Sequence, residues 1–214
     1  PYTTLFRSVR PTTPGMLSRS PSWWQNRRLA DLEKGAPPMQ RVVLELDGHP
    51  EAYALYRHHL RWESTNIPDS RLQVHEAMAT SPLTTRLIWR YLLDIDLMQR
   101  IEVNFLPPDH PLLLMLLEPR RLRLSATDAL WVRVLDVEAA LGSRAWGSQD
   151  ALTIQVDDAL YPSNSGRYRI DGAIGLCART DAPAALRLDI ATLGAAWLGG
   201  FSVRRLADAG RVEE

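Results

Sequence analysis

The chain is poor in cysteine, since Cys177 is the single cysteine among 214 residues. One cysteine cannot close an internal disulfide or build a cysteine cage around a metal ion. Cys177 lies in the apolar run 174–178, where a thiol packs as a small hydrophobic side chain. We therefore expect a buried, unreactive thiol and a cytoplasmic protein.

An excess of either charge is also absent, because 25 Lys and Arg residues balance 25 Asp and Glu residues. Affinity for nucleic acid or for an anionic membrane draws on a net basic surface. The longest apolar run, 112–117, is far shorter than the ~20 residues that cross a bilayer. We expect neither nucleic acid nor a membrane as a partner, and we interpret the basic cluster 120–123 as a solvated strand edge.

Complete metal and nucleophile motifs are missing as well. His58 and His59, with His49 and His75, lack the His-Glu-x-x-His spacing of a helical zinc site. The sequence contains no Gly-x-Ser-x-Gly motif, which forms the strand-to-helix elbow that holds a nucleophilic serine. The sequence therefore predicts no metal ligand.

Two carboxylate pairs resemble acid–base pairs only superficially. Asp157 and Asp158 are neighbours at a strand end, and neighbouring strand residues point to opposite faces. Asp94 and Asp96 lie beside a turn, where acidic side chains are usually solvated. We expect no catalytic and no cofactor-binding residue in this chain, and no substrate-pocket residue can be assigned from the sequence.

Hydrophobic periodicity predicts a mixed unit in the first part of the chain. Ser20 is a predicted N-cap, Asp47-Gly48 a hairpin turn, and Ser81-Pro82 the start of the clearest helix. That helix should pack its stripe of Leu83, Leu87, Ile88, Tyr91, Leu92 and Ile95 onto a sheet. The predicted helices are 21–32, the one from Pro82 and 111–117; the predicted strands are 41–46, 51–59, one from Leu72, one through Ile101, Val103 and Phe105, 121–124 and 130–135.

The pattern changes after residue 136, where Asp136 is a predicted N-cap. Predicted helices are 137–145, 191–198 and 203–209, the last with Ser202 as N-cap and Gly210 as terminator. Predicted strands are 152–156, 167–170, 173–178 and 186–189. Strands between flanking helices indicate an α+β layer, and 214 residues suffice for two modest domains.

Several ordered segments resemble the enhanced intracellular survival (Eis) family of acetyltransferases, which transfer acetyl groups from acetyl-CoA to amines. Residues 129–141 are similar to the junction between its second and third domains. Residues 158–168 and 197–200 with 209–211 resemble its C-terminal domain, which has a fold like that of sterol carrier protein 2. The other similar segments are 14–19 with Trp23 and Trp24, 53–57, and 97–101 ahead of 110–112.

The resemblance also implies an absence. Members of the family begin with a catalytic GNAT domain, in which an Arg/Gln-x-x-Gly-x-Gly/Ala loop at a helix N-terminus binds acetyl-CoA. The glycines let backbone N–H groups approach the pyrophosphate. No such loop occurs in this sequence, and the one adjacent pair, Gly199-Gly200, follows a predicted helix, where a cap or tight turn is expected.

Both ends of the chain differ from the family pattern. Residues 1–8 read like a translated sequencing adapter, so we leave them out of the predicted fold and place the native start near Val9. Family members continue past the segment matched by 209–212 and use their terminal carboxylate as general base. Glu214 does not occupy that position. The family's tyrosine acid lies in the first domain, so no tyrosine here inherits that role.

The resemblance therefore implies a degenerate central GNAT-like domain at 9–135 and a truncated sterol-carrier-like domain at 136–214. The full-length parent would be a hexameric N-acetyltransferase for aminoglycosides, polyamines or lysine-like amines. Acetyl-CoA would be bound by the missing first domain, without a metal, and the fragment alone would be inactive. The alternative is a non-catalytic module for assembly or apolar-ligand binding. Trp23, Trp24 and Trp131 are candidate pocket aromatics, although core positions are the commoner role of such residues.

Overall fold

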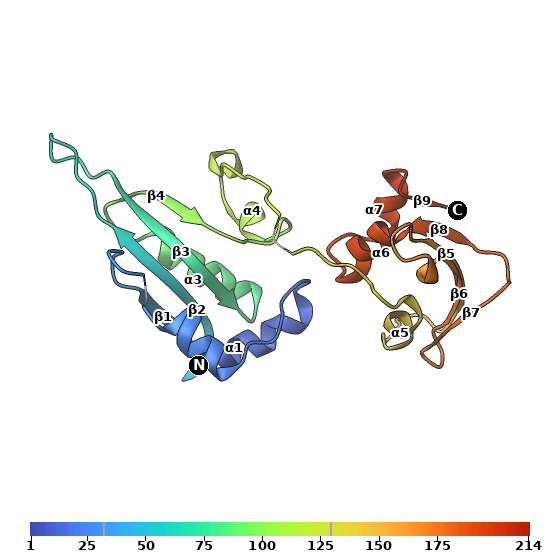
Figure 1. Cartoon of the computed structure of the whole chain (residues 1–214). Coiled ribbons are helices and arrows are strands. Elements are labelled where there is room, and N and C mark those ends of the chain that lie inside the picture. Colours follow the sequence, from blue (N-terminus) through green and yellow to red (C-terminus); the bar gives the residue numbers. More distant parts are fainter. Residues whose placement is uncertain (32, 129) are drawn as a thin grey trace. The chain divides into compact units, whose positions relative to one another are not determined.

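The computed structural model describes residues 1–31, 33–128 and 130–214 (Figure 1). The chain forms two compact units, unit 1 (Pro1–Ala129) and unit 2 (Leu130–Glu214). From the sequence we placed the domain boundary after residue 135, and the structure divides the chain six residues earlier.

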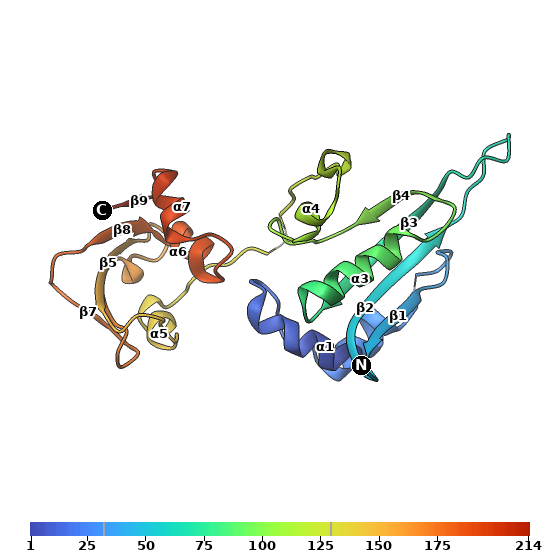
Figure 2. The same cartoon turned by 180° about the vertical axis from the view of Figure 1, so that it is seen from behind.

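Unit 1 is built on a four-stranded sheet in the order β1-β2-β3-β4. Its strands are β1 (Gln40–Leu46), β2 (His49–His59), β3 (Ser70–Ala79) and β4 (Met98–Val103). The first three are antiparallel, and Asp47 and Gly48 both adopt positive φ in the β1–β2 turn, as the predicted hairpin requires. β4 runs parallel to β3, so a crossover is needed, and helix α3 (Pro82–Leu93) supplies it (Figure 2).

Helix α3 begins where the sequence predicted. The Ser81 side chain accepts the Thr84 N–H, and the Thr84 hydroxyl accepts the Ser81 N–H, which completes a capping box. The predicted buried stripe is only partly right, because Leu83 and Tyr91 are exposed. The buried face is rotated to Thr84, Ile88, Trp89 and Leu92, since the bulky indole of Trp89 occupies the space next to the sheet.

Residues on β2 alternate between two hydrophobic clusters, as the period of a strand requires. Ala52, Ala54 and Tyr56 pack on the α3 side, together with Ile88 and Leu92. The opposite face of the sheet carries a second cluster, made of Leu5, Phe6, Trp24, Tyr53 and Leu55. Unit 1 is therefore a sheet covered on both faces.

The N-terminal segment takes part in this second cluster. Residues 2–9 form helix α1 (Tyr2–Val9), whose Leu5 and Phe6 are buried. From the sequence we left residues 1–8 out of the fold; the structure nevertheless packs them, because their two apolar residues share one helical face. That this segment is foreign to the protein stays a prediction.

Several predicted boundaries in unit 1 shift. The helix from Pro21 comprises α2 (Pro21–Trp23) and the π-helical turn η2 (Trp24–Leu29), with Ser20 accepting the Trp23 N–H as predicted. It ends at Leu29, where Ala30 is extended; its predicted end at residue 32 lies outside the described residues. β4 stops at Val103, and Phe105, predicted to lie in it, has φ +61° and is 78% exposed.

The two predicted strands at 121–124 and 130–135 are wrong. After α4 (Leu112–Met115) and the 3-10 turn η3 (Pro119–Arg121), the described residues 122–128 and 130–136 contain no strand. Alternation of apolar residues is not enough, since a strand needs a neighbour that accepts its backbone hydrogen bonds. The cluster 120–123 is mostly exposed, as predicted, but it is no strand edge.

Unit 2 has a five-stranded sheet in the order β7-β6-β5-β8-β9, in which β5 and β8 are parallel and the other pairs antiparallel. Helices α5 (Val137–Gly142), α6 (Ile190–Trp197) and α7 (Val203–Asp208) accompany it, with the short turn η4 (Pro162–Asn164). The strands are β5 (Ala151–Asp157), β6 (Gly166–Asp171), β7 (Leu176–Arg179), β8 (Leu186–Asp189) and β9 (Val212–Glu213).

Local signals in unit 2 predicted the helix starts well, whereas α5 ends at Gly142, three residues before its predicted end. The Asp136 side chain accepts the Ala139 N–H, and the Ser202 side chain accepts the Arg205 N–H, so both predicted N-caps are confirmed. Gly199 follows α6 with φ +79°, which confirms a helix cap in place of a nucleotide loop.

Segment 130–136 is held closely against α6. A Cβ atom at Gly194 would lie 2.5 Å from the carbonyl oxygen of Val132, which belongs to the backbone and cannot rotate away. We expect Gly194→Ala to destabilise unit 2 by about 1–3 kcal/mol, the usual cost of overpacking, despite the better helix propensity of alanine. Gly142→Ala is the matched control, because its Cβ would meet only ordinary contacts from 3.5 Å.

Hydrogen exchange followed by mass spectrometry reads the two units separately and checks this expectation. Faster exchange across unit 2 in Gly194→Ala, with Gly142→Ala unchanged or slower, is the predicted pattern. Equal exchange in both variants would show that segment 130–136 moves away from the added methyl group without a loss of stability in unit 2.

Candidate functional site

The junction between β4 and α4 is a strand-to-helix connection of the kind that can cradle a pyrophosphate. Its connecting residues 104–111 contain no glycine and three prolines, Pro107, Pro108 and Pro111. Each proline lacks the backbone N–H that a phosphate oxygen needs, and side chains at every position keep the backbone away from a ligand.

The first amides of α4 are also already used. The Leu112 N–H donates to Nδ1 of His110 at 3.1 Å, and the Leu113 and Leu114 N–H groups donate to the carbonyls of His110 and Pro111. A helix of four residues adds little dipole. The residues of this junction therefore do not fit the pyrophosphate of acetyl-CoA.

Unit 1 contains a cleft of about 210 Å³ beside η2 and the sheet. Arg57, at the end of the apolar run of β2, is only 2% exposed there. Its Nη2 pairs with Asp31 at 2.7 Å, and its Nη1 donates to the carbonyl of Pro37. The lining residues are Asn26, Arg27, Arg28, Ala30, Glu33, Met39, Leu55, Arg57 and His75.

Electrostatics around this cleft favour an ionised Asp31 beside Arg57 and a neutral His75. The N–H of Met39 and then the guanidinium of Arg57 lower the pKa of Asp31. Burial first, then the positive charge of Arg57, lower the pKa of His75. The cleft thus combines arginines with an uncharged imidazole at neutral pH.

A buried carboxylate, Glu76, lies at the centre of a polar network near this cleft. Arg19 donates to both of its oxygens, at 2.9 and 2.7 Å, and the Tyr53 hydroxyl donates at 2.5 Å. Burial and the adjacent Glu76 raise the pKa of Tyr53. Arg19 also lies 3.8 Å from the ring centre of Phe6, so the network fixes the N-terminal helix to the sheet.

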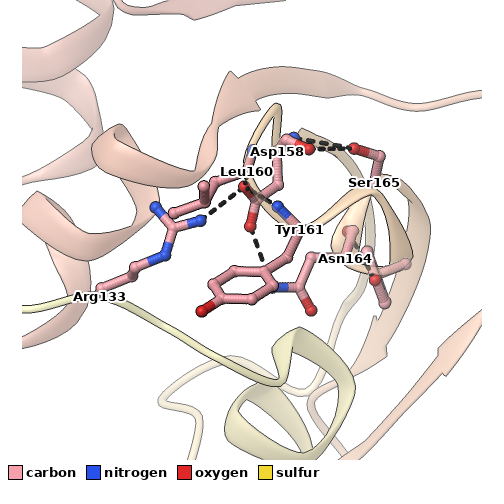
Figure 3. A network of polar contacts seen from close by, with 7 residues as sticks. Arg133, Asp158, Leu160, Tyr161, Asn164 and Ser165 are labelled. Carbon is pink, nitrogen blue, oxygen red and sulfur yellow. Dashed lines mark hydrogen bonds and ion pairs between the residues drawn. The ribbon is translucent and has the colours of Figure 1, made fainter.

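A network of polar contacts in unit 2 surrounds Asp158 (Figure 3). Its Oδ1 accepts from Arg133 at 2.6 Å and from the N–H groups of Leu160 and Tyr161 at 3.0 Å each. Its Oδ2 accepts from the Asn164 amide at 3.1 Å. The carboxylate therefore ties segment 130–136 to the turn after β5.

Hydrogen bonding decides the charge state of Asp158. Burial raises its pKa, but hydrogen bonds from the Tyr161 N–H, Asn164 and Arg133 outweigh burial and lower the pKa to about 2. The group is ionised at neutral pH and fully occupied by partners, which makes it a structural anchor rather than a proton donor.

From the sequence we expected Asp157 and Asp158 to point to opposite faces; Asp157 is exposed, whereas Asp158 is buried in a network that we did not predict. The missed signal is the sequence that follows it, because Asp158 precedes a turn whose N–H groups need an acceptor. Asp94 and Asp96 are exposed as predicted, Asp94 pairing with Arg90 and Asp96 accepting the Leu97 N–H.

The histidines named from the sequence do not assemble. His49 is exposed, His58 packs edge-on against Tyr56, and Nε2 of His59 bonds to Gln73 at 2.9 Å. His75 alone lines the cleft. Within residues 1–31, 33–128 and 130–214, no group of three or more His, Cys, Asp or Glu side chains is placed to hold a metal.

The named aromatic and thiol residues separate into core and surface. Trp24 is buried in the cluster with Phe6, and Trp23 packs against it, whereas Trp131 is 83% exposed. Cys177 is buried, as predicted, and burial raises the pKa of its thiol to about 11, which keeps it protonated.

None of the helices in the described parts of the chain is long and apolar enough to span a membrane.

Comparison with known proteins fits this two-unit organisation. A family model described as an acetyltransferase (GNAT) domain matches residues 15–134. The chain belongs to the GNAT acetyltransferase family. A second model, described as a sterol carrier protein domain, matches residues 137–214 of this GNAT family member. The mixed α and β fold expected from the sequence, with these two domain types in this order, is confirmed.

Relatives of this GNAT chain are N-acetyltransferases from bacteria. An uncharacterized N-acetyltransferase of Streptomyces avermitilis is 37% identical over 215 residues, covering 98% of the chain and 52% of the relative. The N-acetyltransferase Eis of Mycobacterium bovis is 31% identical over 214 residues, covering 99% of the chain and 50% of the relative. The chain thus spans about half the length of the curated relatives it matches.

Solved structures agree with the sequence relatives. Eis1 from Mycobacterium abscessus has a TM-score of 0.72 at 30% identity, over 98% of this chain and 53% of that one. A GCN5-related N-acetyltransferase from Anabaena variabilis has a TM-score of 0.67 at 19% identity, over 99% of this chain and 53% of that one, and shows the shared fold. Membership of the GNAT family is therefore confirmed, and the chain is similar to Eis proteins, as the ordered segments predicted.

Proposed function

We propose that this chain is a non-catalytic part of an Eis-like N-acetyltransferase that transfers the acetyl group of acetyl-CoA to an amine. In this proposal the chain supplies the central GNAT-like domain and the sterol-carrier-like domain. The acetyl-CoA site belongs to a first domain that is not part of this sequence. The single observation that carries the proposal is the β4–α4 junction, whose prolines and occupied amides leave no cradle for a pyrophosphate.

The similarity to longer proteins supports the same assignment of functions to domains. Matches to N-acetyltransferases extend over nearly the whole chain but only about half of each relative. The proposed substrates are aminoglycosides, polyamines or lysine-like amines, the proposed assembly is a hexamer, and the proposed location is the cytoplasm. Trp131 is an exposed aromatic residue available for substrate or subunit contacts.

Acetyl-CoA is expected not to bind the purified 214-residue chain. Isothermal titration calorimetry of acetyl-CoA into the chain should show only heats of dilution, because the junction has no glycine and the first amides of α4 are occupied. The same titration into a longer protein carrying a GNAT domain with the glycine loop upstream of this sequence should show saturable binding.

Acetyl-CoA-dependent acetylation of spermidine or kanamycin by the 214-residue chain would overturn the proposal. Activity that appears only with the longer protein would support it. Coenzyme A serves as a control ligand, since it shares the pyrophosphate and lacks the acetyl group.

A second candidate function is an assembly or apolar-ligand module. The observation in its favour is an open groove of about 520 Å³ in unit 2, lined by Val132, Val134, Leu135 and Trp197 among others. Native mass spectrometry of the purified chain distinguishes the two: a co-purifying lipid of fixed mass supports this candidate. A discrete oligomer without bound lipid would support assembly and exclude the binding of an apolar ligand.

A further inference from the structure

Unpartnered buried donors converge on the cleft of unit 1. Within the described residues of this unit, three buried side-chain nitrogens have no hydrogen-bond partner: Arg28 Nε, Arg57 Nε and His75 Nε2. All three residues line the same cleft. Because a buried donor without an acceptor is costly, their convergence points to a ligand that supplies acceptor atoms.

The nearby carboxylates do not fill this role. Glu33 approaches Arg57 Nε to 3.5 Å and Glu76 approaches Arg28 Nε to 3.4 Å, close enough for attraction but without hydrogen-bond geometry. Glu33 is largely exposed, and Glu76 is already held by Arg19 and Tyr53. Both arginines line the cleft and keep an Nε–H without a hydrogen-bond acceptor.

The rest of the lining limits the chemistry of the ligand. Ala30, Met39 and Leu55 contribute apolar side chains to the lining. Three arginines and the carboxylate of Glu33 line the cleft. With the groups that pair with them, Asp31, Glu76 and Arg19, four arginines face three carboxylates, an excess of one positive charge that suits one negative charge. The 210 Å³ of the cleft equals about seven water molecules at ~30 Å³ each, room for a short carbon chain.

We propose that this cleft binds a small monocarboxylate, whose oxygens accept from Arg28, Arg57 and His75 while its carbon chain packs on Met39 and Leu55. The unpartnered Nε–H groups of Arg28 and Arg57 offer one charge-assisted hydrogen bond each, which matches the two oxygens of one carboxylate. Inorganic phosphate is the disfavoured occupant, because it carries more charge and leaves the apolar side chains uncovered.

The pKa of His75 should show whether the cleft is occupied by a carboxylate. Burial and the charges of Arg57, Arg28 and His59 lower its pKa, and Glu33 acts in the opposite direction. A bound carboxylate adds a negative charge beside Nε2, so it raises the pKa of His75. His110 is the internal control, since burial lowers its pKa too but its Nδ1 is occupied by the Leu112 N–H, outside the cleft.

The test is a pH titration of histidine resonances by NMR in the 214-residue chain, without and with millimolar sodium butanoate. The expected result is an upward shift of the His75 pKa and an unchanged His110. Sodium phosphate and sodium chloride at equal ionic strength should leave His75 nearly unmoved. No shift of His75, or an equal shift at His110 or with phosphate, overturns the proposal.

Variants complete the test. Arg28→Gln should weaken butanoate binding at least tenfold while the fold persists, because Arg19 and Tyr53 still hold Glu76. Arg90→Gln removes the same charge from an exposed pair with Asp94 and should leave affinity unchanged. Equal affinity in both variants contradicts the site, and restored binding in Arg28→Lys relative to Arg28→Gln supports it.

Discussion

Glu76→Ala is expected to destabilise unit 1 by about 3–5 kcal/mol, the usual cost of removing one partner of a buried ion pair. The change leaves the guanidinium of Arg19 and the hydroxyl of Tyr53 without an acceptor in a region closed to water. Urea unfolding monitored by hydrogen exchange in unit 1 measures the loss. Helix α1 should detach first, because Arg19 joins Glu76 to Phe6.

Two companion variants define the cause. Glu76→Gln keeps one acceptor oxygen and removes the charge, so we expect a smaller loss than in Glu76→Ala. Asp94→Ala breaks an exposed pair with Arg90 and should cost no more than about 1 kcal/mol. A Glu76→Ala protein as stable as Asp94→Ala would show that the network contributes nothing beyond a surface pair.

Local chemistry made much of the fold predictable. The Asp47-Gly48 turn, the caps at Ser81, Asp136 and Ser202, and the strand at 186–189 each depend on residues a few positions apart. Such features are decided by backbone preferences and nearby side-chain oxygens, which a sequence displays directly. Helix α6 was predicted almost as closely, because its observed span is shifted by only one residue from the predicted 191–198.

Long-range pairing set the limits of prediction. The alternation at 130–135 is as regular as that of a strand, but no neighbour in the described chain offers it a ladder. Val134 is instead buried in the core of unit 2 beside Val137. A sequence shows which residues seek burial, and only the folded chain shows whether a strand partner is present.

The candidate sites could not be predicted from the sequence for the same reason, because their residues lie far apart along the chain. Glu76 meets Arg19 across 57 residues, and Arg133 meets Asp158 across 25. One signal was available for the cleft, because Arg57 ends the otherwise apolar run 52–57 of β2. A charge in a buried strand needs partners, so Arg57 marked a site even though its neighbours Asp31 and His75 could not be named.

Asp158→Asn is expected to lower the melting temperature of unit 2 by about 5 °C or more. The asparagine replaces one acceptor oxygen by an NH₂ group, which then faces the donor amide of Asn164 or the guanidinium of Arg133. Segment 130–136 loses its anchor. Asp157→Asn is the matched control, since it makes the same change at the adjacent, exposed residue.

The pH profile distinguishes lost charge from a general packing defect. Because the folded-state pKa of Asp158 is about 2, below the ordinary value of about 4, its contribution is complete above pH ~4 and disappears as pH falls through about 2. The stability gap between native chain and Asp158→Asn should therefore narrow over that window, while Asp157→Asn follows the native curve. A gap that stays constant down to pH ~2 would assign the loss to packing and remove the ionised carboxylate as the anchor of segment 130–136.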